Sequence, residues 1–147
     1  MNKILMSLVL GVSSLQIQAF PCYITVVKDS CWTKYDVTVT VSHVGKPVVS
    51  VLVPNGQSWA RQTFECEPKE AISFTSTFLP VIWQSDAGKV YSAQHAWALP
   101  EAIGQGDRAW NIPICYPADF SEVPLPPDAG QNCKCDMKSV PPIQLKA

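Results

Sequence analysis

The chain has 147 residues, of which 47% are hydrophobic and 16% charged, a size and composition that suit one domain with a modest core. Its formal net charge is −1 at pH 7. This charge argues against binding to nucleic acids or anionic membranes, because proteins with those roles usually have a basic surface.

The first residues predict a secretory signal peptide over residues 1–19. Lys3 precedes an apolar run over residues 4–12, and Ala19 supplies a small residue at the expected cleavage site. The run is shorter than the roughly 20 apolar residues that span a bilayer, and no later segment is suitable, so no transmembrane segment is predicted. Pro21 precedes Cys22 where lipid attachment requires a small residue, which disfavours a lipoprotein. We expect an exported protein of the periplasm or the external medium.

Strands are predicted, in chain order, over residues 22–27, 35–43, 48–53, 58–66, 71–79, 90–99 and 109–115. The clearest has Val37, Val39 and Val41 on one side of an extended chain and polar residues on the other, the alternation of a half-buried strand. Gly45 supplies the turn to the next strand, so the pair predicts a hairpin. Pro113 weakens the last of the seven strands.

Seven short strands with turn signals between them predict an all-β fold, an antiparallel immunoglobulin-like β-sandwich over residues 20–116. An eight-stranded barrel is the alternative. From residue 117 to residue 147 prolines recur and apolar residues become sparse. This part is predicted to be a Pro-rich extended tail, tied down by disulfides.

The cysteines all lie beyond the expected cleavage site, and their even number in an exported chain predicts disulfide bonds. They are Cys22, Cys31, Cys66, Cys115, Cys133 and Cys135. Cys133 and Cys135 point to opposite faces of an extended segment, so we expect each to have its own partner and to pin the tail. Cys22 and Cys31 are not expected to pair, because an extended strand separates them by more than a disulfide spans.

Aromatic residues supply the candidate binding positions. Trp32 and Trp83 lie near loop ends, where binding residues are common. Tyr91, His95 and Trp97 share one face of the strand predicted over residues 90–99, and together they suit a glycan or an aromatic group. The competing interpretation is ordinary packing, because most tryptophans are largely buried.

No catalytic residue, metal or cofactor is assigned. The sequence contains neither G-x-S-x-G nor H-E-x-x-H, and a hydrolase would need a serine or aspartate beside His43 or His95. A metal site would need Cys133 and Cys135 as free thiols, in competition with disulfide formation. The sequence thus favours an exported, non-enzymatic β-sandwich that binds a protein or glycan partner. The alternatives are a small secreted hydrolase and a metal-handling periplasmic domain.

Overall fold

The computed structural model describes residue 11, residues 20–99 and residues 109–143, so all of the predicted signal peptide except Gly11 lies outside the described residues. Among these residues, no helix combines the length and the apolar character needed to cross a bilayer. One short 3-10 helix, η1 (Gln84–Asp86), accompanies eight strands. The strands are β1 (Phe20–Lys28), β2 (Asp36–His43), β3 (Lys46–Val53), β4 (Trp59–Cys66), β5 (Ala71–Leu79), β6 (Tyr91–Ser92), β7 (Trp97–Ala98) and β8 (Trp110–Tyr116).

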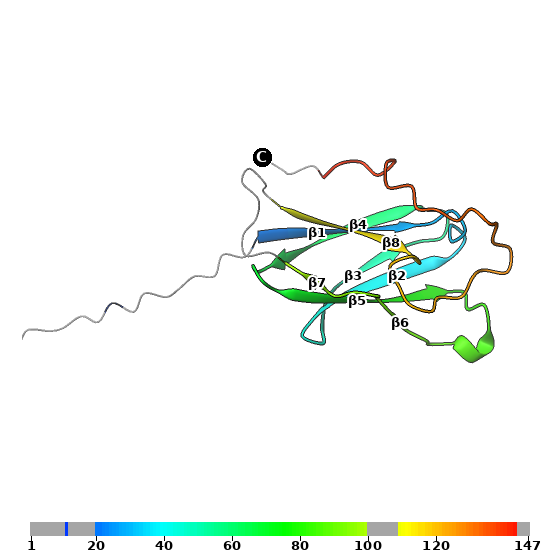
Figure 1. Cartoon of the computed structure of the whole chain (residues 1–147), viewed down its shortest axis with the longest axis horizontal. Helices are drawn as coiled ribbons and strands as arrows, with labels where there is room; N and C mark the ends of the chain where they lie inside the picture. The colour runs from blue at the N-terminus through cyan, green and yellow to red at the C-terminus, as the bar shows by residue number, and fades with distance from the viewer. Residues whose placement is uncertain (1–10, 12–19, 100–108, 144–147) are drawn as a thin grey trace, which may run out of the picture.

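The strands form two sheets, which confirms the all-β prediction and the two-layer sandwich (Figure 1). One sheet has three strands in the order β4-β1-β8. The other has five, in the order β3-β2-β5-β6, with β7 also paired to β5. The alternation in the sequence decided which faces meet: Val37, Val39 and Val41 are all fully buried between the sheets.

The expectation of an antiparallel sandwich is wrong for one pair of strands. β1 and β8 run parallel, with Cys22 opposite Trp110 and Lys28 opposite Tyr116, so the three-stranded sheet is mixed. The strand order also departs from the immunoglobulin order, which places the second and third strands in opposite sheets. Here β2 and β3 form an antiparallel hairpin within one sheet. Pro113 is accommodated because β8 is an edge strand. It has a neighbouring strand on one side only and therefore tolerates a residue without a backbone N–H.

The prediction of one continuous strand over residues 90–99 is also wrong, because two short strands, β6 and β7, occupy this range. Tyr91 in β6 lies opposite Ser76, and Trp97 in β7 lies opposite Ile72. The chain takes six residue steps from Tyr91 to Trp97 while β5 takes four from Ser76 to Ile72, so two extra residues bulge from the edge. An extra residue in one strand leaves the ladder and bends the strand locally. Alternation alone does not reveal such an insertion.

Trp32 is the largest side chain of the core and is fully buried. Its ring centroid lies 4.8 Å from that of Tyr35, 4.7 Å from Phe78 and 5.1 Å from Tyr116. Tilted and edge-on aromatic pairs of this kind each contribute about 0.5–1.5 kcal/mol beyond the burial of apolar area. Trp32 therefore joins the loop after β1 to strands of both sheets.

Three disulfides hold the sandwich and the segment that follows it. Both cysteines near the end of the chain have partners of their own, as expected, and Cys22 does not pair with Cys31. The bonds are Cys22–Cys66, Cys31–Cys133 and Cys115–Cys135. In Figure 1 the orange part of the segment after β8 passes around one end of the sandwich, and the red part runs along the side of the three-stranded sheet that faces away from the other sheet. The tail is thus a covalently held cover on that face.

Candidate functional site

The five candidate binding residues occupy three different environments. Trp32 and Tyr91 are core residues, 0% and 3% exposed. Trp83 is 61% exposed and lies on the connection between β5 and β6. His95 and Trp97 line one pocket at the bulge between β6 and β7. The structure therefore brings together two of the five and places the other three elsewhere.

The bulge meets the turn that follows β8. The backbone N–H of Gln94 donates a hydrogen bond to the carbonyl oxygen of Asp119 at 2.9 Å. Its side-chain Nε2 donates to the carbonyl oxygens of Ala118 and Phe120 at 3.2 and 3.3 Å. An isolated antiparallel bridge joins Ala93 to Phe120. These contacts connect the edges of the two sheets and leave a cavity of about 310 Å³ beside them.

This cavity, which we call the bulge pocket, has an apolar floor and a polar rim. The floor consists of the core side chains Phe74, Ile114 and Phe120, which are 1%, 1% and 3% exposed. Half-buried Trp97 also lines the pocket. The exposed residues Gln94, His95 and Asp119 supply its polar lining. An apolar cavity with a few convergent polar groups is the usual form of a binding site, and its volume lies near the lower end of the usual range of about 300–1,000 Å³.

The polar rim is held in place by the fold. Asp119 Oδ2 accepts a hydrogen bond from the backbone N–H of Cys115 at 2.7 Å. Cys115 is in turn bonded to Cys135, so the rim is attached to the tail by a short covalent path. Positions restrained in this way lose little conformational freedom when a ligand binds, which favours affinity.

A second apolar surface lies on the connection between β5 and β6, which includes η1 and projects from one end of the five-stranded sheet (Figure 1). Leu79 is 60% exposed, Trp83 61% and Val90 54%. Single exposed apolar residues are common, but an exposed tryptophan on a projecting connection suits contact with a partner.

His43, which was considered as a catalytic residue of a hydrolase, does not line the bulge pocket. His43 Nδ1 is 2.9 Å from Glu70 Oε1. In the part of the chain that the structure describes, no hydrogen bond joins a serine to either histidine. The His43–Glu70 pair therefore positions an imidazole beside a carboxylate without a neighbouring hydroxyl nucleophile in hydrogen-bond contact.

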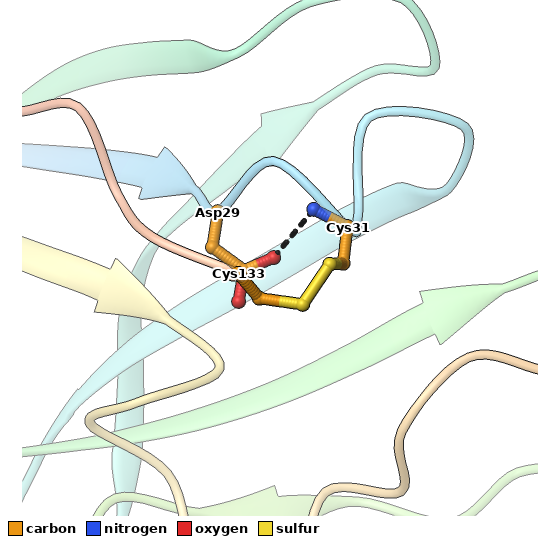
Figure 2. A group of neighbouring side chains, drawn as sticks. All are labelled: Asp29, Cys31 and Cys133. Carbon is orange, nitrogen blue, oxygen red and sulfur yellow. Dashed lines mark hydrogen bonds between the residues drawn. A yellow bond between two sulfur atoms is a disulfide. The ribbon is translucent and has the colours of Figure 1, made fainter. Parts of the chain in front are cut away.

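Asp29, Cys31 and Cys133 form a cluster of metal-ligand residue types, whose ligand atoms lie within 4.8 Å of one another (Figure 2). The two sulfur atoms are bonded to each other, and a disulfide sulfur is not the thiolate that binds metals. Asp29 Oδ1 accepts a hydrogen bond from the Cys31 N–H at 2.9 Å. Burial raises the pKa of Asp29, while hydrogen bonds from the backbone N–H groups of Cys31 and Trp32 lower it. In this bonded state the cluster orders a turn.

The sequence did not point to Gln94, Asp119 or Phe120 as parts of a site. The last two fall in the segment predicted to be a tail, because prolines follow closely. The sequence held one signal, because Phe120 is an aromatic residue within an otherwise polar stretch. In the structure its side chain is 3% exposed.

Comparison with protein-family models, with curated proteins and with solved structures finds no match for this chain. The functional argument therefore depends on the chemistry of the site.

Proposed function

We propose that this chain is an exported, non-enzymatic binding protein whose bulge pocket receives an apolar side chain of a protein partner. The observation that carries this proposal is the combination of a core-lined floor, a tryptophan beside it and an exposed polar rim in one cavity. The three disulfides support a location in an oxidising compartment, such as the periplasm or the external medium.

The apolar floor of the pocket favours a protein partner over a glycan. The floor is made of Phe74, Ile114 and Phe120, which suits a branched or aromatic anchor that is fully desolvated on binding. A sugar ring instead requires a flat, exposed aromatic surface, and Trp97 is half-buried. Trp97, His95 and Gln94 nevertheless combine an aromatic face with hydrogen-bonding groups, so a glycan is the alternative outcome of the test below.

We also propose that the domain is immunoglobulin-like in the broad sense, a two-sheet sandwich that recognises partners through loops and edges. Sandwiches of this architecture differ in strand order and share no sequence similarity. The exposed Trp83 connection and the bulge pocket are the two places where a partner would meet such a surface.

The test uses a variant that fills the pocket without altering the core. Ala96 is exposed and lines the pocket, so Ala96→Leu adds bulk at the mouth. Gln57→Leu, on the exposed turn between β3 and β4, is the control. Displayed random peptides selected on the wild-type protein should carry a recurrent aromatic or branched residue and should bind Gln57→Leu as well. They should bind Ala96→Leu at least tenfold more weakly.

Equal binding of the selected peptides to both variants would contradict the bulge pocket as the site. A glycan array is run on the same three proteins. Glycan binding that is lost only in Ala96→Leu, together with no peptide enrichment, would replace the protein partner with a glycan at the same pocket.

A further inference from the structure

The outer face of the three-stranded sheet carries a row of polar side chains. Thr25 in the central strand β1 lies opposite Arg61 in β4 and opposite Pro113 in β8. Arg61 Nε donates a hydrogen bond to Thr25 Oγ1 at 2.7 Å. The Thr25 hydroxyl then donates to Asn111 Oδ1 at 3.3 Å. Because its oxygen accepts this bond, Asn111 presents its amide nitrogen as a donor.

The tail lies over this row. Arg61 Nη2 donates a hydrogen bond to the carbonyl oxygen of Pro141 at 2.9 Å. Between the tail and the sheet is a cavity of about 500 Å³, which we call the tail cavity. Thr25, Arg61 and Asn111 form its polar side. The remaining lining is apolar and consists of Pro113, Met137, Val140, Pro141, Pro142 and Ile143.

Arg61 has no acidic partner within the described ranges. The carboxylates of Asp128 and Glu70 instead lie beside Lys34 and His43. The guanidinium is partly buried, and its Cζ lies 5.3 Å from the centroid of the Trp59 ring. Burial lowers the pKa of Arg61. A cation that is partly desolvated and lacks a counter-charge attracts an anion.

We propose that the tail cavity binds a monocarboxylate that carries an apolar chain, such as a medium-chain fatty acid. The Nη1 and Nη2 groups at the end of Arg61 and the Asn111 amide bind the carboxylate, because guanidinium and carboxylate groups match in a two-pronged geometry. Met137, Val140 and Ile143 pack on the apolar chain. A carboxylate fits better than a phosphate dianion, because one guanidinium and one neutral amide match a single negative charge.

The test is calorimetric titration of the intact, disulfide-bonded protein with three probes below their aggregation limits. Decanoate should bind. Decanol, which has the chain without the charge, and acetate, which has the charge without the chain, should each bind at least tenfold more weakly. The Arg61 Nε–H resonance should shift when decanoate is added and should stay in place with decanol. Absence of decanoate binding, or equal binding of decanol, would overturn the proposal.

Two variants locate the binding. Arg61→Gln should weaken decanoate binding at least tenfold, and Arg61→Lys should restore only part of it, because an ammonium lacks the planar fork. Val140→Asp places a fixed carboxylate in the tail beside the cavity and should also abolish binding. Since Val140 lies outside both sheets, this variant tests the site even where Arg61→Gln lowers stability. Unchanged decanoate affinity in Val140→Asp would contradict the site.

Lys46→Gln, on the edge of the other sheet, is the matched control and should bind decanoate as the wild-type protein does. The tail cavity and the bulge pocket are separate, so Ala96→Leu should also leave decanoate binding unchanged. Loss of decanoate binding in either control would move the site away from Arg61 and refute the assignment.

Discussion

The ammonium nitrogen of Lys28 lies 2.8 Å from the carbonyl oxygen of Tyr35, although Lys28 is only 2% exposed. The same nitrogen donates to the carbonyl oxygen of Pro54 at 2.9 Å. One buried cation therefore joins the end of β1 to the loop before β2 and to the turn after β3. Burial lowers the pKa of Lys28, while the nearby charge of Asp36 raises it.

Replacement of this cation should destabilise the fold. Lys28→Met keeps the aliphatic stem but removes a donor from the carbonyl oxygens of Thr33, Tyr35 and Pro54. Thr33 and Pro54 each keep a hydrogen bond from a backbone N–H, so Tyr35 loses most. An unsatisfied buried group costs about 1–3 kcal/mol, and we expect the free energy of unfolding in urea to fall by about that amount. Lys46→Met on the exposed edge should change it by less than about 0.5 kcal/mol. Equal effects of the two substitutions would show that the loop carbonyls do not depend on Lys28.

The carboxyl group of Asp29 should make stability depend on pH. Burial raises its pKa above the ordinary value of 3.8, so just above that pH the folded protein binds more protons than the unfolded chain. The stabilising contribution of Asp29 to the free energy of unfolding is therefore complete at low pH, and it is lost as the pH rises through the pKa of the folded state. The stability of the wild-type protein relative to Asp29→Asn should thus decrease between pH 3.5 and pH 7, measured by urea unfolding.

Asp128→Asn is the control, because Asp128 lies on the surface in an exposed pair with Lys34. The difference in the free energy of unfolding between Asp128→Asn and the wild-type protein should change less over the same pH range. A relative stability of the wild-type protein that instead increases with pH would contradict the assigned cause, the burial of Asp29.

The three disulfides should differ in their resistance to reduction. Cys22 and Cys66 are both 0% exposed, whereas Cys31 and Cys133 are half-buried and closer to solvent. A dithiol reductant acts by thiolate attack on an accessible sulfur atom. Under native conditions we therefore expect Cys31–Cys133 to open before Cys22–Cys66, as measured by alkylation of free thiols and mass spectrometry.

Complete reduction should also lower the melting temperature strongly. Loss of a native bridge from a small secreted domain typically costs about 2–5 kcal/mol. A melting temperature that is the same before and after full reduction would show that packing alone holds the sandwich.

Two tryptophans that had equivalent places in the sequence analysis should differ strongly in how much their substitution lowers stability. Trp32→Ala removes a ring that is fully buried among aromatic neighbours, so it should cost about 3–5 kcal/mol. Trp83→Ala removes a ring that is 61% exposed and should change the free energy of unfolding by less than about 0.5 kcal/mol. A comparable loss in both variants would contradict the burial of Trp32 in the core.

The sequence by itself determined the position of most strands and the faces that they bury. β5 begins at Ala71 and ends at Leu79, as predicted, and the valines of β2 face the core. These features follow from period-two alternation, which is a local property of an extended chain. The chemistry of adjacent positions likewise showed that Cys133 and Cys135 need different partners.

Apart from the predicted hairpin of β2 and β3, only the tertiary structure decided which strands pair and in which direction. The parallel pairing of β1 with β8 joins segments far apart in the sequence, and alternation carries no information about a distant neighbour. The bulge after β6, the inclusion of Phe120 in the core and the position of the tail over Arg61 have the same origin. Each is set by contacts between distant segments, so both candidate sites became visible only when those segments were brought together.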